Sequence, residues 1–284
     1  MVFLFCALYH EASPLISHYH LKREDSFSLF QVFHGGDIVL AVTGVGKHAA
    51  SVCVSHMLTR YCPSNRLGTD DVVISYGSAG GIGFDVGEVY GISRILDEES
   101  GRWFYPDLHA HADIPMAPLV TSGAPVSLPD APVSAGGFLY DMEGSAIFAA
   151  ASYFAGPHQI HLWKVVSDAL HPEQIDLEAF RNHMLNGAKP LIAWIDAHID
   201  STSTKVTAPA EDTTIYERLC QELHLSRYQS IELSHLLHFC TLSNLPIQPV
   251  VDALYDEALL PAPNKRKGSM VFEILKSRLL QSFS

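Results

Sequence analysis

The chain of 284 residues is 48% hydrophobic, enough for one large domain or for a domain of about 200 residues with an appendage. Its formal net charge is −13, and residues 1–204 carry −12 of it, with 10 Lys and Arg against 22 Asp and Glu. Nucleic-acid binding depends on cations that neutralise phosphates, and a membrane span needs ~20 consecutive apolar residues, which the sequence lacks. The composition therefore argues against both partners and is compatible with a neutral or cationic small ligand.

Residues 2–8 are apolar and follow no basic segment, so we expect a first buried strand there rather than a signal peptide. The five cysteines are scattered and form no C-x-x-C pair, which is typical of a reducing compartment. We therefore expect a cytoplasmic protein.

Segments with strand patterns alternate along the chain with segments of helical pattern. The predicted strands are residues 2–8, 27–33, 38–43, 72–76, 86–93 and 160–166. The predicted helices start at Ser13-Pro14 and cover residues 48–61, 143–154 and 175–198. Residues 97–136 are rich in Pro, Gly and His and are expected to be mostly loop. The alternation indicates a central, partly parallel sheet flanked by helices.

The C-terminal part has a different pattern. Polar residues 201–212 predict a linker between a domain of residues 1–200 and a helical extension of residues 213–284. Thr214 and Glu217 form a capping box, and apolar residues recur beyond it at helical spacing. The sequence leaves open whether this extension packs on the core, extends an oligomer interface or docks a partner protein.

Two carboxylates occupy positions at which catalytic or ligand-binding residues are common. Glu143 lies between a short strand and a helix rich in small residues, and Asp168 ends an apolar strand. Ligands bind at the carboxyl ends of strands in open α/β sheets. A carboxylate that is desolvated there has a raised proton affinity and can act as an acid near neutral pH.

Two glycine-rich segments follow other predicted strands. Residues 77–83 read Gly-Ser-Ala-Gly-Gly-Ile-Gly and predict a loop where the backbone approaches a ligand closely. Residues 44–47 read Gly-Val-Gly-Lys, which is too short for a phosphate-binding loop and favours the packing of a helix end.

These motifs carry a family resemblance. Residues 141–146, Asp-Met-Glu-Gly-Ser-Ala, residues 166–169, Val-Ser-Asp-Ala, and residues 77–81 resemble the purine nucleoside phosphorylase and nucleosidase superfamily. Within it, the chain is most similar to the 5′-methylthioadenosine/S-adenosylhomocysteine nucleosidases. The resemblance covers residues 1–200 and implies a three-layer α/β/α nucleoside phosphorylase-like fold with a mixed central sheet, next to the C-terminal helical extension. It also implies a homodimer that needs neither a metal nor an organic cofactor.

The resemblance assigns the leaving base to the motif at residues 166–169. Asp168 is the acid that engages N7 of the purine, and Ser167 orients it. The alternative for Asp168 is a carboxylate at a strand end that caps the next turn.

The sugar is assigned to two other motifs. Glu143 binds the ribose hydroxyls and Met142 packs against the sugar, while Ser78, Ala79 and Gly80 lie beside the ribose and the nucleophile. The alternative for Glu143 is an acidic residue in a first helical turn, which the helix dipole favours.

The nucleophile decides between two reactions. Glu11 matches the residue that deprotonates the attacking water in the nucleosidases, and its alternative is an ordinary loop acid. Phosphorylases of the superfamily have an Arg where this chain has Ser75. We therefore expect purine nucleoside hydrolysis that releases the free base and a ribose derivative. The alternatives are a phosphate-dependent phosphorylase and a non-catalytic nucleoside sensor that acts through its helical tail.

Two features depart from the family or invite another function. Residues 122–126 lack the aromatic wall that stacks on the base in the family, and Trp103, Phe104 or Tyr105 are possible substitutes. The sequence also has 16 histidines, but neither His109-Ala-His-Ala-Asp113 nor the pair His235 and His238 has a known zinc spacing. We therefore expect no metal site.

Overall fold

The protein is described here from a computed structural model that covers residues 1–25, 29–62, 66–107, 114–128, 137–204, 210–226, 229–230, 233, 236–237, 240 and 245–281. The chain divides into two compact units, Met1–Asp200 and Ser201–Ser284. The histidine-containing positions that were considered for a metal and not assigned to one, residues 109–113, 235 and 238, lie outside the described residues.

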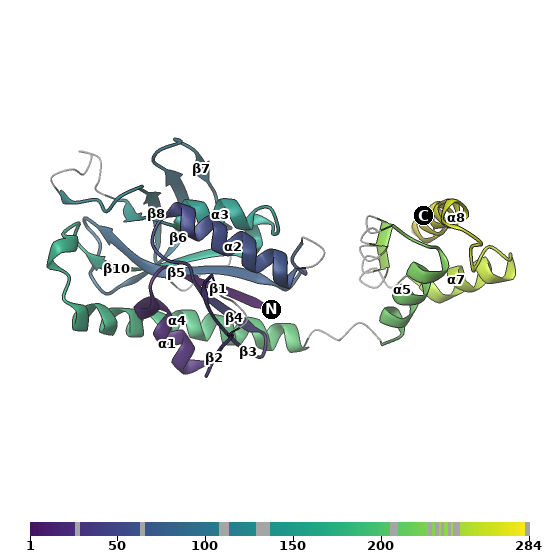
Figure 1. Cartoon of the computed structure of the whole chain (residues 1–284), viewed down its shortest axis with the longest axis horizontal. Coiled ribbons are helices and arrows are strands. Elements are labelled where there is room, and N and C mark those ends of the chain that lie inside the picture. The colour runs from purple at the N-terminus through teal and green to yellow at the C-terminus, as the bar shows by residue number, and fades with distance from the viewer. Residues whose placement is uncertain are drawn as a thin grey trace. The chain divides into compact units, whose positions relative to one another are not determined.

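The first unit contains a mixed sheet whose strands and helices follow the expected alternation (Figure 1). The strands are β1 Val2–Cys6, β2 Lys22–Arg23, β3 Gln31–Gly35, β4 Ile38–Val42, β5 Val72–Gly81, β6 Val89–Asp97, β7 Trp103–Phe104, β8 Met116–Thr121, β9 Leu139–Asp141 and β10 Ile160–Asp168. The helices are α1 Tyr9–His18, α2 Lys47–Tyr61, α3 Gly144–Ala151 and α4 Leu177–Thr204, and the short 3-10 turns are Pro157–Gln159 and Pro172–Gln174.

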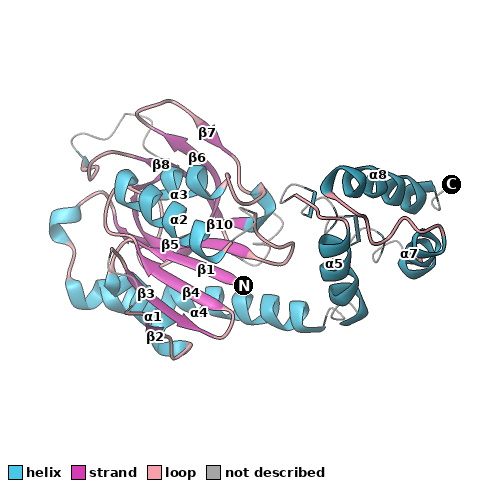
Figure 2. Cartoon of the chain, turned by 45° about the vertical axis from the view of Figure 1, so that its right-hand side comes forward, coloured by secondary structure: helices cyan, strands magenta, loops and turns pink. Residues whose placement is uncertain are grey.

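Helices cover both faces of this sheet, as Figure 2 shows with strands in magenta and helices in cyan. One hydrophobic core lies between the sheet and helices α2 and α3, and a second lies between the sheet and helices α1 and α4. Strand β1 is buried along its whole length because it contributes side chains to both cores. The predicted three-layer α/β/α fold is therefore confirmed.

Strand β5 organises the sheet. It pairs in parallel with β1 through its first half and with β10 along most of its length, and its last residues pair with β9 in the antiparallel direction. Because β10 also pairs with β6, and β8 connects β6 to β9, five strands form a closed ring of pairings. Because β1, β5 and β10 run parallel, their carboxyl ends lie at one edge of the sheet.

The predicted loop at residues 77–83 is wrong over its first part, since β5 continues to Gly81. Glycine has little intrinsic strand preference, but Gly80 has a partner on each side: Asp168 in β10 and Tyr140 in β9. Pairing with strands distant in sequence therefore gives the glycine-rich end of β5 its strand conformation.

The prediction of loop for residues 97–136 missed β8, which pairs with β6 and β9. Its pattern includes Pro118, a residue that normally argues against an interior strand because it cannot donate a ladder hydrogen bond. The pairing of β6 with β8 has a register shift between Ile92 and Arg94, immediately before the pairing of Arg94 with Pro118. An irregularity of this kind is where a sheet tolerates proline.

Helix α1 begins at Tyr9, before the predicted start at Ser13-Pro14, and Pro14 lies inside it. Proline removes the N–H that would bond to the carbonyl of His10. The hydroxyl of Ser13 donates to that carbonyl instead, at 3.2 Å. This bond gives the His10 carbonyl a donor in place of the missing N–H.

The second unit is helical, as expected for the C-terminal extension. Helices α5 Ala210–Glu222, α7 Ile247–Asp256 and α8 Lys265–Gln281 share a separate hydrophobic core that includes Leu219, Leu254 and Phe272. The predicted linker of residues 201–212 is helical at both ends, because α4 ends at Thr204 and α5 begins at Ala210. Ser and Thr weaken a helix without breaking it, so the polar composition placed the helix ends incorrectly. No helix in the described ranges is long and apolar enough to cross a bilayer.

Candidate active site

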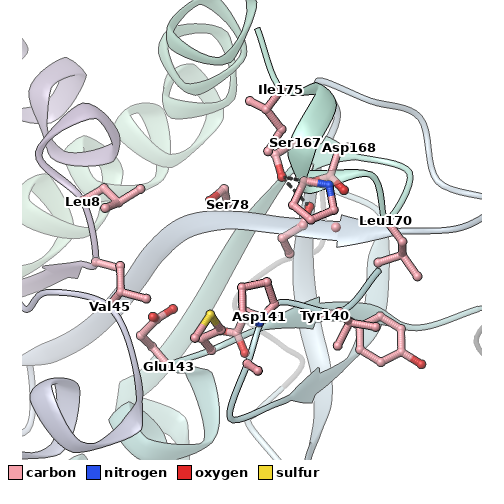
Figure 3. Close-up of a pocket in the computed structure, with 18 of the residues that line it drawn as sticks. Leu8, Val45, Ser78, Tyr140, Asp141, Glu143, Ser167, Asp168, Leu170 and Ile175 are labelled. Carbon is pink, nitrogen blue, oxygen red and sulfur yellow. Dashed lines mark hydrogen bonds between the residues drawn. The ribbon is translucent and has the colours of Figure 1, made fainter. Parts of the chain in front are cut away.

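A cavity of about 270 Å³ opens at the edge where β1, β5 and β10 end (Figure 3). All eight residues that the sequence analysis assigned to the site line it: Glu11, Ser78, Ala79, Gly80, Met142, Glu143, Ser167 and Asp168. The other lining residues are Ala7, Leu8, Val45, Ala124, Pro125, Val126, Tyr140, Asp141, Leu170, Pro172 and Ile175. The tertiary structure therefore brings together three acids that are distant in sequence.

Glu11 lies in the first turn of α1 and is 2% exposed. Its Oε1 accepts hydrogen bonds from the backbone N and the Oγ of Ser78, at 2.8 and 2.7 Å. Its Oε2 accepts one from the backbone N of Leu8, at 2.9 Å, which caps the helix. A carboxylate oxygen has two acceptor positions, so Oε2 retains one for a further donor such as water.

Glu143 is the N-cap residue of α3 and is 6% exposed. Its Oε1 accepts a 2.6 Å hydrogen bond from the backbone N of Gly46, whose φ of 99° is unfavourable for other residues. Burial and the charge of Asp141 raise the pKa of Glu143 to about 7, although Lys164 and the Gly46 bond act in the opposite direction. Glu143 therefore changes its charge near neutral pH.

Behind Glu143 lies an ion pair that the sequence analysis missed. Lys164 in β10 is 3% exposed, and its Nζ lies 2.8 Å from Oδ2 of Asp141. Burial lowers the pKa of Lys164, but the charges of Asp141, Glu143 and Glu11 outweigh it and raise the pKa above its usual value. A lysine in an otherwise apolar strand was the signal that could have revealed this pair, since lysine is seldom buried without a partner.

Asp141 accepts two further hydrogen bonds at the sheet edge. Its Oδ1 accepts a hydrogen bond from Oγ1 of Thr121, and its Oδ2 accepts one from the backbone N of Gly144, each at 2.7 Å. The same Thr121 oxygen accepts from the backbone N of Ser145. Asp141 thus fixes the start of α3, and with it the position of Glu143.

Asp168 is turned into the cavity by a bulge in β10. Val166 pairs with Ala79 and Asp168 pairs with Gly80, so one extra residue, Ser167, lies between the two pairings. Bulges of this kind redirect side chains next to functional sites. The absence of a side chain at Gly80 leaves room for the carboxylate, since a Cβ there would lie 3.1 Å from Oδ1 of Asp168.

The Asp168 carboxyl has two local partners. Oγ of Ser167 lies 2.7 Å from its Oδ2 and 3.3 Å from the carbonyl oxygen of Ala79. Because the Ser167 hydroxyl has one proton, it donates either to Asp168 or to Ala79. The backbone N of His171 donates to Oδ1 at 2.8 Å, so Asp168 also caps the next turn, as the alternative interpretation expected.

The aromatic residues considered as substitutes for the missing wall do not line the cavity. Trp103 packs against Phe138 with Arg94 over both rings, and Phe104 packs against Phe148. Tyr105 is 64% exposed. Trp103 and Phe104 belong to strand β7, and the direction of their side chains depends on pairing and contacts that the local sequence does not encode.

The charged side chains among the described lining residues of the cavity are all acidic. Four carboxylates line it (Glu11, Asp141, Glu143 and Asp168), and no Lys, Arg or His is among its described lining residues. Within the same described ranges, no group of three or more His, Cys, Asp and Glu side chains is arranged to hold a metal ion. The cavity is suited to a neutral or cationic ligand and unsuited to an anion.

Comparisons with known proteins agree with the fold. Residues 2–127 match the model of the phosphorylase superfamily. An MTA/SAH nucleosidase structure aligns with a TM-score of 0.56 and 20% identity over 69% of this chain and 95% of its own. The 5′-methylthioadenosine/S-adenosylhomocysteine nucleosidase from S. pneumoniae aligns with a TM-score of 0.55 and 18% identity over 68% and 97% of the two chains.

The corresponding enzyme from Neisseria meningitidis has a TM-score of 0.53 and 18% identity over 70% of this chain and 98% of its own. No curated protein sequence matches the chain significantly. These solved structures are aligned along almost their whole length with about two thirds of this chain. The predicted resemblance to the phosphorylase and nucleosidase superfamily is thus confirmed by the superfamily match and by the fold, to which the C-terminal helices are an addition.

Proposed function

We propose that residues 1–200 form a nucleosidase that hydrolyses the N-glycosidic bond of a purine nucleoside, releasing the free base and a ribose derivative. The observation that carries this proposal is the convergence of Glu11, Glu143 and Asp168 on one cavity whose described lining residues include no cation. Cleavage of this bond needs an acid at the base, a clamp on the ribose and a base for the nucleophile. The three carboxylates supply one group for each task.

Asp168 is assigned to the leaving base. When protonated, it transfers its proton to N7 as the bond between N9 and C1′ breaks and the bonding electrons move to the purine. Ser167 supports both protonation states, because its hydroxyl can donate to Ala79 while Asp168 holds the proton and to Asp168 afterwards. A positioned acid of this kind contributes ~10²–10⁴ in rate.

Glu11 is assigned to water. The free acceptor position on Oε2 takes a proton from the attacking water, whose oxygen forms the new bond to C1′. The Ser78 and Leu8 bonds fix the carboxylate so that this position stays oriented.

Glu143 and Met142 are assigned to the ribose. Oε1 of Glu143 accepts one bond from Gly46, and the acceptor positions that remain on the carboxylate are assigned to the sugar hydroxyls. Ser78, Ala79 and Gly80 form the cavity surface beside the sugar.

Water is favoured over phosphate as the nucleophile. Phosphate binding needs cations or many N–H donors, whereas this cavity has four lining carboxylates, and Ser75 occupies the position of the phosphorylase Arg. No metal or organic cofactor is part of the proposal.

The resemblance also supports a cytoplasmic homodimer, and sedimentation of the full chain measures the oligomeric state.

The test is release of free base from a panel of purine nucleosides, including 5′-methylthioadenosine, with and without phosphate. Hydrolysis predicts release without phosphate, and Asp168→Asn and Glu11→Gln should each lower kcat by ~10²–10⁴. Asp168→Asn keeps an oxygen for the backbone bond from His171, so its melting temperature should change little. Glu11→Gln keeps one of the backbone bonds from Leu8 and Ser78 and loses the other, so its melting temperature should fall and is measured beside kcat. Release only with phosphate would establish the phosphorylase, and tight binding without release would establish the sensor.

A further inference from the structure

The cavity has an apolar half next to Asp168. It is formed by the segment Ala124, Pro125 and Val126 after β8, and by Tyr140, Leu170 and Pro172. Since Asp168 is proposed to hold the base at N7, the rest of the purine must lie against this half. Tyr140 is the single aromatic residue among the described residues that line the cavity.

The sheet brings Tyr140 and Asp168 to the same side. Tyr140 pairs with Gly80 in the antiparallel ladder between β9 and β5, and Asp168 pairs with the same glycine on its other side. Residues paired across a ladder point to the same face. The Asp168 carboxylate lies where a Gly80 side chain would point, because a Cβ there would be 3.1 Å from its Oδ1.

Leu170 connects the two residues. Its Cδ2 would lie 3.0 Å from a Cβ at Gly80, and its side chain is in one buried cluster with Tyr140 and Val120. Figure 3 shows Tyr140 next to Leu170, on the side of the view opposite Leu8 and Val45. Tyr140 is therefore packed against Leu170 and Val120, is 7% exposed, and lines the cavity.

We propose that Tyr140 provides the aromatic contact surface for the purine base, in place of the wall that is absent from residues 122–126. This inference rests on the proposed function. The ring acts through its hydrocarbon surface and not through its hydroxyl. Its position in a strand, opposite Gly80, makes it part of a rigid element.

Three variants of the full chain test the proposal: Tyr140→Leu, Tyr140→Phe and the control Trp103→Leu. The control removes an aromatic side chain of β7 that does not line the cavity. The measurements are the Kd of free adenine and hypoxanthine by calorimetry, KM and kcat for the best nucleoside, and the melting temperature. Base–aromatic contacts of 1–3 kcal/mol correspond to about 5–150-fold in affinity.

We expect Tyr140→Leu to weaken base binding and raise KM about tenfold or more, with kcat changed less than KM. Tyr140→Phe should restore both values to within about twofold, and Trp103→Leu should leave them unchanged. A purely structural role predicts a lower melting temperature and a lower kcat with base affinity retained, and that result would overturn the inference. If the wild-type chain releases no base, the proposed function fails, whereas wild-type release with unchanged base affinity in Tyr140→Leu sinks the Tyr140 assignment alone.

Discussion

Nζ of Lys164 lies 2.8 Å from Oδ2 of Asp141, and both side chains are almost fully buried. The pair connects β10, which ends at Asp168, with β9, which leads to Glu143. Two acids of the proposed site are therefore joined through one buried charge pair, whose removal affects stability as well as chemistry.

Lys164→Met is expected to destabilise the chain by ~3–5 kcal/mol, because it leaves the Asp141 carboxylate buried without its cation. Urea unfolding at pH 7 measures the change. The double variant Lys164→Met with Asp141→Asn removes the unpaired charge and should recover part of the loss. A single variant as stable as the wild type would show that the pair is energetically neutral.

The pKa of Glu143 predicts a dependence of stability on pH. Its value of about 7 in the folded chain lies above its usual 4.5, so folding favours the protonated form. This contribution is fully present below pH 4.5 and is lost as the pH rises through about 7. At pH 8 the ionised side chain costs roughly 3 kcal/mol.

Glu143→Gln should therefore match the wild type in stability near pH 4.5 and exceed it at pH 8. Melting temperatures at pH 4.5, 6 and 8 give the comparison. Glu178→Gln, which removes an exposed carboxylate from α4, serves as the control. A difference between Glu143→Gln and the wild type that stays constant across this range would refute the raised pKa.

Gly80→Ala is expected to displace the carboxylate of Asp168. The added Cβ would lie 3.0 Å from Cδ2 of Leu170 and 3.1 Å from Oδ1 of Asp168, so both side chains must move. A misplacement of about 1 Å can cost ~10²-fold in rate. Single-turnover release of base should slow by at least tenfold while the far-ultraviolet circular dichroism stays that of the wild type. Unchanged turnover would mean that Asp168 does not act at this position.

Truncation after Thr204 tests whether the first unit folds and releases base without the second. The cavity and both cores of the first unit are formed by residues before position 204, whereas the C-terminal helices have a core of their own. The shortened chain should fold and release base with a kcat within about twofold of the full chain. If it folds but releases no base, the helical extension takes part in catalysis.

The local sequence determined the alternation of strands and helices, the helical extension and which motif residues line the cavity. It could do so because apolar periodicity and short motifs are properties of neighbouring residues, as in the buried run of β1 and the Met142-Glu143 pair. Strand β8 with Pro118, and the extension of β5 to Gly81, were not predictable in this way, because pairing with distant strands overrides local preference.

Only the tertiary structure decided how the site is built. The bulge that turns Asp168, the Gly46 donor to Glu143, the burial of Lys164 against Asp141 and the placement of Tyr140 all depend on segments far apart in sequence. Hydrogen bonds, desolvation and charge interactions act over distances in space, so a sequence can name a carboxylate while the folded chain sets its partners and its pKa.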